Sequence, residues 1–358
     1  MIWPSHGSNP QYLYEAIDKQ MPEERIDFSA NINPLGPPRE FKDRWGILFQ
    51  YISDYPDPHA ALLKSKLAAT EGIKETQILV GNGGAELITL IGRMIAGKHA
   101  LIIQPAFSEY EEACRVNNCR VSYYQLEPGN WGLDMEALSE KLKAADAVFF
   151  CNPNNPTGVY YPKALVEKLI EECQKHSCLL IMDEAFYDFA CDYQSIVPFI
   201  GKDTNVVVLR SMTKMFSIPG LRLGYMMAGE RLIERAAALK PHWSVNALAL
   251  KAGEWCLDSN EHVRLTKNLI RQERERLVSF YRSLNFAVSP SDVNFYLLRD
   301  PRLDDQLPLF QFLLEMGIIP RHTMNFPGLE GRWLRFAIKG PKDNNRLMEA
   351  MEEWRKVR

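Results

Sequence analysis

The chain has 358 residues, of which 46% are hydrophobic and 24% are charged. These values are typical of a folded globular protein and exclude a disordered or repetitive one. The formal net charge of −3 leaves no general basic excess for binding nucleic acid. The sequence has no apolar run of 18 residues and no signal-peptide pattern, so we expect a cytoplasmic protein without a membrane segment.

The cysteines indicate a reducing environment. There are seven of them, an odd number, and none forms a CxxC motif or a metal-type spacing with histidine. We therefore expect reduced thiols, most of them packed in the interior, and no metal site.

The first forty residues are irregular, but from residue 55 to 239 short apolar runs alternate with segments of helical pattern. The runs predict strands at 77–80, 100–103, 120–125, 147–151, 179–183, 206–210 and 224–228. Helices are expected at 85–95, 108–117, 134–144 and 163–176. Strands this apolar are covered on both faces, so the sequence predicts an α/β fold with a mostly parallel seven-stranded sheet flanked by helices.

The pattern changes after Pro241. We expect helix over 246–284, with the charged run at 271–277 on a solvated face, then strands near 286–288, 294–298 and 333–338. Further helices are expected near 307–316 and 344–356. This predicts a large domain at 40–245 and a smaller α/β domain of residues 1–39 and 246–358, because chain ends often lie together.

Polar motifs follow several of the predicted strands, where a parallel sheet binds its ligands. The sequence GNGGAE at 81–86 opens a helix and is suited either to an anion or to a plain turn. The sequence NPNNPTG at 152–158 contains two X-Pro steps, which make a rigid loop that can hold an asparagine amide or serve as a turn.

A second group of motifs suggests a phosphate and a reactive amine. Asp183 ends a predicted strand, where a carboxylate is costly unless it meets a cation or caps a helix. The sequence SMTK at 211–214 follows another strand, and Arg222 lies eight residues after Lys214. Hydroxyls and a guanidinium make a phosphate clamp. Burial near positive charge lowers the pKa of a lysine such as Lys214, which suits Schiff-base chemistry.

Taken in order, the motifs GNGGAE, PAF (105–107), NPNNPTG, DEAF (183–186) and SMTK with its following arginine resemble the fold type I enzymes that depend on pyridoxal 5'-phosphate (PLP). This group is the aspartate aminotransferase superfamily, and the resemblance covers nearly the whole chain. It implies that Lys214 forms a Schiff base with PLP and is the catalytic residue. A carboxylate such as Asp183 would keep the pyridinium nitrogen protonated.

The resemblance also implies the other contacts of the cofactor. Asn155 would donate to the ring oxygen and Phe107 would stack on the ring. The phosphate would be held by Gly84, Ala85, Ser211, Thr213 and Arg222. Tyr55 resembles a tyrosine that reaches the phosphate from a neighbouring subunit, which implies a homodimer with shared active sites. Arg335 would bind the carboxylate of the substrate.

Two branches of the superfamily fit, histidinol-phosphate aminotransferase and L-threonine-O-3-phosphate decarboxylase. Three features favour the decarboxylase: the segment DFSANINPLGPP at 27–38 with Ile32 in place of an acidic residue, the segment SHGSN at 5–9, and Phe186 in place of a tyrosine. Arg321 resembles the arginine that binds the substrate phosphate in both branches, and His6 and Asn31 would complete that pocket. The implied reaction is decarboxylation of L-threonine O-3-phosphate to (R)-1-amino-2-propanol O-2-phosphate in cobalamin biosynthesis.

A regulatory protein that binds PLP without catalysis is a third possibility. It is disfavoured because Lys214 stands in its full motif and the charge is mildly acidic.

Overall fold

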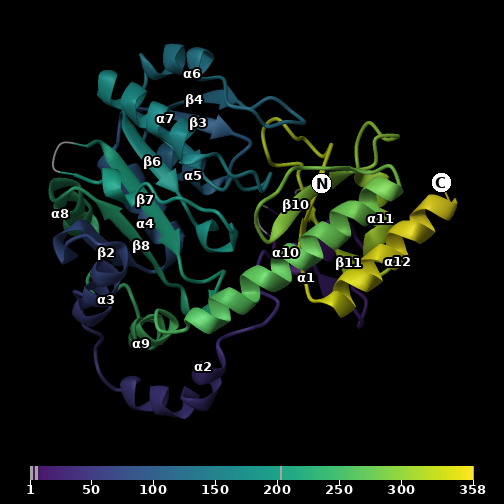
Figure 1. Ribbon diagram of the computed structural model, residues 1–358, viewed down its shortest axis with the longest axis horizontal. Coiled ribbons are helices and arrows are strands. Elements are labelled where there is room, and N and C mark those ends of the chain that lie inside the picture. Colours follow the sequence, from purple (N-terminus) through teal and green to yellow (C-terminus); the bar gives the residue numbers. More distant parts are fainter. Residues whose placement is uncertain (1–2, 5–6, 202–203, 358) are drawn as a thin grey trace.

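A large sheet and a smaller one lie beside each other in the computed structural model, which describes residues 3–4, 7–201 and 204–357 (Figure 1). The large sheet has seven strands in the order β2-β8-β7-β6-β5-β3-β4. They are β2 (Ile78–Gly81), β3 (His99–Gln104), β4 (Arg120–Gln125), β5 (Ala147–Cys151), β6 (Leu179–Asp183), β7 (Val206–Ser211) and β8 (Gly224–Ala228). β8 runs antiparallel to both neighbours, and the other pairings are parallel. The predicted α/β fold with a mostly parallel seven-stranded sheet is confirmed.

The strands are apolar throughout because helices cover both faces of this sheet. In β7, Val206 and Val208 point to one hydrophobic core, whereas Val207 and Leu209 point to the other. The first core includes α6 (Met135–Leu142) and α7 (Lys163–Lys175). The second includes α4 (Gly83–Met94), α5 (Glu109–Val116) and α8 (Glu230–Leu239). Two-sided burial therefore explains the continuous apolar runs.

The smaller sheet is antiparallel, with the order β12-β13-β10-β9. Its strands are β9 (Ala287–Val288), β10 (Phe295–Arg299), β12 (Arg321–His322) and β13 (Leu334–Ala337). The helices α10 (Asn260–Ser283), α11 (Leu307–Glu315) and α12 (Pro341–Val357) lie beside it (Figure 1). The N-terminal segment joins this region because β1 (Ile26–Asp27) pairs in parallel with β11 (Ile318–Ile319). The exact division into two domains stays a prediction.

The remaining helices are α1 (Pro10–Ala16), α2 (Arg39–Asp43), α3 (Ala61–Glu71) and α9 (Ala247–Cys256), of which α3 packs against β2 and α9. The helix expected over 246–284 is two helices, α9 and α10. The first forty residues, expected to be irregular, contain α1. Every helix in the described part of the chain is too short or too polar to span a lipid bilayer.

The solvated face expected for residues 271–277 is wrong at Glu273. This residue is buried, and its Oε2 accepts a hydrogen bond of 2.7 Å from Nδ2 of Asn344 in α12. It also pairs with Arg276 at 2.6 Å. The charged run therefore also connects α10 to α12, because buried charges persist where they find partners.

A buried ionic network lies beneath the ends of β6 and β7. Arg210 of β7 pairs with Glu184 at 2.9 Å and with Glu71 of α3 at 2.6 Å. Its guanidinium also lies 3.8 Å from the centre of the Tyr187 ring. These contacts connect the sheet to α3 immediately before the motif that begins at Ser211.

Close packing between α4 and α5 depends on Gly92. A Cβ atom at this position would lie 2.6 Å from the carbonyl oxygen of Ala113 in α5. That oxygen belongs to the backbone and can move only if the helices separate. The two helices therefore pack more closely than any larger residue at position 92 permits.

We expect Gly92→Ala to lower the free energy of unfolding by about 1–2 kcal/mol, because overpacking a core outweighs the gain in helix propensity. Urea denaturation measures this loss. Gly340→Ala is the control, because a Cβ at Gly340 meets no atom within 4 Å. Equal stability of the Gly92 variant and the wild type would contradict the packing argument.

Candidate active site

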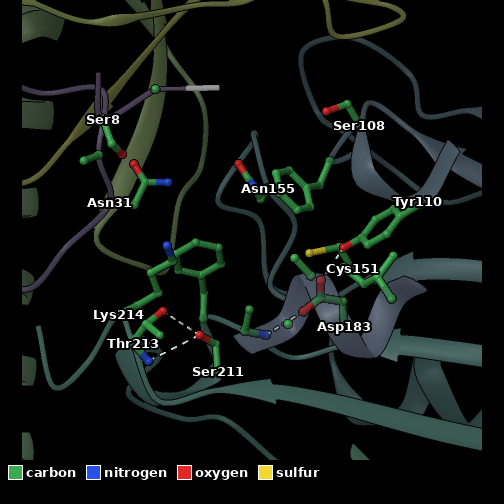
Figure 2. A pocket seen from close by; sticks show the side chains of 18 of the residues that line it. Ser8, Asn31, Ser108, Tyr110, Cys151, Asn155, Asp183, Ser211, Thr213 and Lys214 are labelled. Carbon is green, nitrogen blue, oxygen red and sulfur yellow. Dashed lines mark hydrogen bonds between the residues drawn. The ribbon is translucent and has the colours of Figure 1, made fainter. Parts of the chain in front are cut away.

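A cavity of about 250 Å³ lies at the carboxyl ends of the parallel strands. It collects polar side chains that are far apart in the sequence. The predicted site residues in its wall are Asn31, Gly84, Ala85, Phe107, Asn155, Asp183, Ser211, Thr213, Lys214, Arg222, Arg321 and Arg335. The structure thus brings most of the predicted site together (Figure 2).

One corner of the cavity has the geometry of an anion site. The N-terminus of α4 opens there, and Gly83 has a φ of +77°. A Cβ on Gly83 would lie 2.6 Å from Nη2 of Arg222, so only glycine lets the guanidinium lie against this turn. Ser211 and Thr213 complete the corner, and their hydroxyl oxygens are 2.8 Å apart. Backbone N–H groups, hydroxyls and a guanidinium are together suited to a phosphate.

Arg222 itself adopts a left-handed backbone conformation, with φ +59° and ψ +78°. This conformation is unfavourable for a residue with a side chain. It lies at the end of the turn between β7 and β8, and Nη1 of Arg222 donates to the carbonyl oxygen of Pro219 at 3.1 Å. The turn directs the guanidinium back toward α4.

Asp183 lies on the side of the cavity opposite Asn31 and Ser8, close to Tyr110 and Cys151 (Figure 2). Its Oδ2 accepts a hydrogen bond of 2.5 Å from the Tyr110 hydroxyl, and its Oδ1 accepts one of 2.9 Å from the Ala185 N–H. Burial raises the pKa of this carboxyl, while these hydrogen bonds and the charge of Lys214 oppose the rise. A positively charged ligand group would stabilise the carboxylate here.

Lys214 follows Thr213 and extends into the cavity (Figure 2). Desolvation lowers its pKa to about 8, and the charges of Arg222 and Arg335 act in the same direction. Asp183 opposes this shift but does not cancel it. About a tenth of this amine is therefore neutral, and nucleophilic, at pH 7, several hundredfold more than for a lysine of ordinary pKa.

Two buried arginines form the wall that the smaller sheet contributes. Arg321 of β12 and Arg335 of β13 are direct partners across the antiparallel ladder. Burial lowers the pKa of both, to about 10 for Arg321 and about 9 for Arg335. Nη1 and Nη2 of Arg335 donate to Oδ1 of Asn155 at 2.5 Å and to the carbonyl oxygen of Ser29 at 2.7 Å. Within the described chain, its Nε and the Oδ1 of Asn31 are buried without a hydrogen-bond partner, which indicates room for a polar ligand.

The loop at 152–158 is rigid because its other asparagines are used inside it. Asn152 exchanges hydrogen bonds of 2.8 and 3.0 Å with the backbone of Tyr161. Oδ1 of Asn154 accepts from the Thr157 hydroxyl at 2.8 Å, and its Nδ2 donates to the carbonyl oxygen of Pro105 at 3.2 Å. Asn155 is left to face the cavity.

Among the described residues, one predicted site residue does not line the cavity. Tyr55 is 84% exposed, and its ring lies 5.2 Å from that of Trp243. His6 lies outside the described residues, although the adjacent Gly7 and Ser8 line the cavity. Phe186 is part of the cavity wall, and the Tyr187 ring packs under Arg210 instead of facing the cavity.

Sequence reasoning missed several residues of the cavity wall, among them Tyr110, Cys151, Ser108 and Asn325. Tyr110 lies three residues after Phe107, and Asn325 lies four residues after Arg321. Nη2 of Arg321 donates to Oδ1 of Asn325 at 2.7 Å. Spacing from a motif residue was thus the available signal, but it does not show which buried group a side chain contacts.

Comparison with known proteins identifies the family of this chain. The model of the aminotransferase class I and II family matches residues 23–351. The chain belongs to this family. Its members bind PLP, and the cavity fits this cofactor because an amine, a carboxylate and a phosphate-type corner surround one space. The chain is a PLP-dependent enzyme, and the expected cofactor is confirmed.

Its relatives include proteins from both expected branches. The chain is 35% identical over 353 residues to a threonine-phosphate decarboxylase from Salmonella typhimurium, a match that spans 97% of this chain and 95% of the relative. It is 30% identical to a histidinol-phosphate aminotransferase from Pyrococcus furiosus, covering 92% of each chain.

Solved structures give the same two names. The histidinol-phosphate aminotransferase from Clostridium acetobutylicum has a TM-score of 0.87 at 29% identity, over 92% of this chain and 99% of that one. The L-threonine-O-3-phosphate decarboxylase from Porphyromonas gingivalis has a TM-score of 0.80 at 28% identity, over 91% and 98%.

The lowered pKa of Lys214 predicts how the apoprotein takes up PLP. Only the neutral amine attacks the aldehyde, so the uptake rate should rise about tenfold per pH unit and level off above the pKa of about 8. Stopped-flow absorbance measures the rate, and borohydride trapping with peptide mapping identifies the lysine. In Arg335→Gln a lowering charge is lost, so the break should move to higher pH. A break near 10.5 in the wild type would contradict the prediction.

Proposed function

We propose that this enzyme decarboxylates L-threonine O-3-phosphate to (R)-1-amino-2-propanol O-2-phosphate, a step of cobalamin biosynthesis. The observation that carries the proposal is the pair of buried arginines, Arg321 and Arg335, that face the same cavity as Lys214. A substrate with both a carboxylate and a phosphate supplies one anion for each guanidinium.

The arginines bind and orient the substrate in this proposal. Arg335 holds the α-carboxylate, and Arg321 holds the phosphate with Asn31 and His6. A hydrogen bond to a charged group contributes about 1.5–3 kcal/mol, so each arginine contributes one to two decades of affinity. Because Arg335 is already held by Asn155 and Ser29, little side-chain entropy is lost on binding.

The other side chains hold the cofactor. Asp183 pairs with its pyridinium nitrogen, Nδ2 of Asn155 donates to its ring oxygen, and Phe107 packs on its ring. Its phosphate is bound by Gly84, Ala85, Ser211, Thr213 and Arg222. Bound PLP supplies an electron sink for the bond that breaks at the substrate α-carbon. Lys214 anchors the cofactor and returns a proton to that carbon, a role that its lowered pKa permits.

Several sequence features support the decarboxylase over the aminotransferase. The match to the Salmonella decarboxylase covers more of this chain, at higher identity, than the match to the Pyrococcus aminotransferase. Phe186 lies in the cavity wall, and the centre of its ring is 4.8 Å from that of Phe295. Unlike a tyrosine, it has no hydroxyl to donate to the cofactor ring. The alternative function, histidinol-phosphate aminotransferase, is supported by the Clostridium structure. The same two arginines could there serve a phosphorylated amine and, in turn, a dicarboxylate acceptor.

A substrate comparison tests the proposal. The holoenzyme is incubated with L-threonine O-3-phosphate while released CO₂ is measured, and separately with L-histidinol phosphate and 2-oxoglutarate while glutamate is measured. We expect CO₂ from the first and no glutamate from the second, because L-threonine O-3-phosphate carries a carboxylate and a phosphate on one molecule, whereas L-histidinol phosphate carries the phosphate alone. Glutamate without CO₂ would refute the decarboxylase. Lys214→Ala is the control and should abolish either turnover.

We also propose that the enzyme is a homodimer with shared active sites. The support is an exposed apolar surface made by Trp45, Phe49, Ile52 and Tyr55. We propose that a second copy of this chain covers it. Phe49 is 79% exposed, and the segment that carries it extends from the body of the molecule beside α2 (Figure 1). Such a surface is too apolar to remain in water. Tyr55, absent from the cavity of its own chain, would then reach the cavity of the partner.

Subunit complementation tests this sharing. Lys214→Ala and Tyr55→Ala subunits are co-expressed with different tags, and the mixed dimer is isolated. One of its two sites should be intact, because Lys214 comes from one subunit and Tyr55 from the other, so it should regain about half of the wild-type activity. Activity no higher than that of the Tyr55→Ala homodimer would place Tyr55 outside the partner's site.

A further inference from the structure

We propose that Tyr110 is a positioning residue that keeps Asp183 ionised and fixed in orientation beneath the cofactor ring. The inference rests on the role proposed above for Asp183. It holds whichever substrate the enzyme takes, because the cofactor is common to both branches.

Tyr110 is fixed by its packing. It lies in the first turn of α5 and is 1% exposed. Its ring is stacked on that of Phe149, with centres 5.2 Å apart and planes at 19°. It meets the Phe107 ring edge-on at 6.0 Å and 84°. A side chain held between two rings has one orientation, so its hydroxyl has one position.

That position is directly on Asp183. The hydroxyl donates to Oδ2 at 2.5 Å, and the Ala185 N–H donates to Oδ1 at 2.9 Å. Two donors, one on each oxygen, define the plane of the carboxylate. Tyr110 also packs against Phe107, so one side chain contacts two of the three residues assigned to the cofactor ring.

Tyr110 matters because the other groups around Asp183 give it little help. Cys151 of β5 lies next to Asp183 in the sheet register, and burial raises the pKa of its thiol, so it brings no positive charge. Lys214 is the cation that acts on Asp183 in the free protein, but its amine is bonded to the cofactor in the holoenzyme, so this help is then lost. Burial meanwhile raises the pKa of Asp183. The phenol, whose own pKa is raised by burial, and the Ala185 N–H therefore remain as the donors that oppose this rise.

The physical consequence concerns the proton between Asp183 and the ring nitrogen. Without the phenol the carboxylate is more basic and draws that proton away from the ring. A ring that is less often protonated withdraws electrons less well, so the chemical step slows. Substrate binding is assigned to Arg321 and Arg335 of the smaller sheet and should change little.

The experiment compares wild-type and Tyr110→Phe holoenzyme. The absorbance of the bound cofactor is measured as the pH is lowered, and the midpoint is the pH at which half of the change has occurred. In the variant we expect this midpoint to rise by about one pH unit. We expect kcat to fall about tenfold with KM within about twofold, since the loss is confined to the chemical step. Tyr281→Phe is the matched control, because it removes another buried phenol, bonded to Tyr296 at 2.8 Å and away from the cavity, and should leave the midpoint unchanged.

The outcomes separate this inference from the proposed function. Asp183→Asn serves as the reference: if it changes the spectrum and Tyr110→Phe does not, the inference is overturned while the role of Asp183 stands. An equal shift in Tyr281→Phe would also overturn it. Should Tyr110→Phe not fold, 3-fluorotyrosine placed at position 110 strengthens the donor and should lower the midpoint, and an unmoved midpoint then counts against the inference.

Discussion

An excess of positive charge in a poorly solvated cavity is the constraint on which this active site depends. Lys214, Arg222, Arg321 and Arg335 line one space with Asp183. Burial lowers the pKa of Lys214, Arg321 and Arg335, which shows that each cation is costly where it stands. The fold holds them there through the ladder of β12 and β13 and the left-handed turn at Arg222. Phosphate and carboxylate groups relieve this cost, so charge balance itself selects anionic ligands.

The large sheet was predictable because its physical signal is local. Residues 206–209 are all apolar because both faces of β7 are buried. A short apolar run between two helices is typical of such a strand, so the sequence alone indicates it. The two-residue strands β1, β11 and β12 gave no such signal, because they exist only through pairing with distant segments. Glu273 was assigned to solvent for the same reason: its partner Asn344 is 71 residues away.

In the candidate site, too, residues with a local sequence signal were predicted, and residues defined by distant contacts were missed. Motifs at strand ends located Lys214, Asp183 and the phosphate corner, because the carboxyl ends of parallel strands meet at one edge. Tyr110 escaped notice, since a tyrosine in an amphipathic helix resembles any core residue until its contact with Asp183, 73 residues away, is seen. The expected contact of Tyr55 with the cofactor phosphate cannot be seen in a single chain, because the contact is expected in the active site of another subunit.

The register of β12 and β13 fixes the spacing between two arginines of the site. Directly opposed residues of antiparallel strands have Cα atoms about 4.5–5.5 Å apart, and strand pairing does not let this spacing vary. The guanidiniums of Arg321 and Arg335 therefore start from a fixed separation on one face of a rigid ladder. Under the proposed function, homologous phosphoamino acids with one or two additional methylenes offer both anions at the wrong interval, so we expect the small sheet to discriminate among them by length as well as by charge.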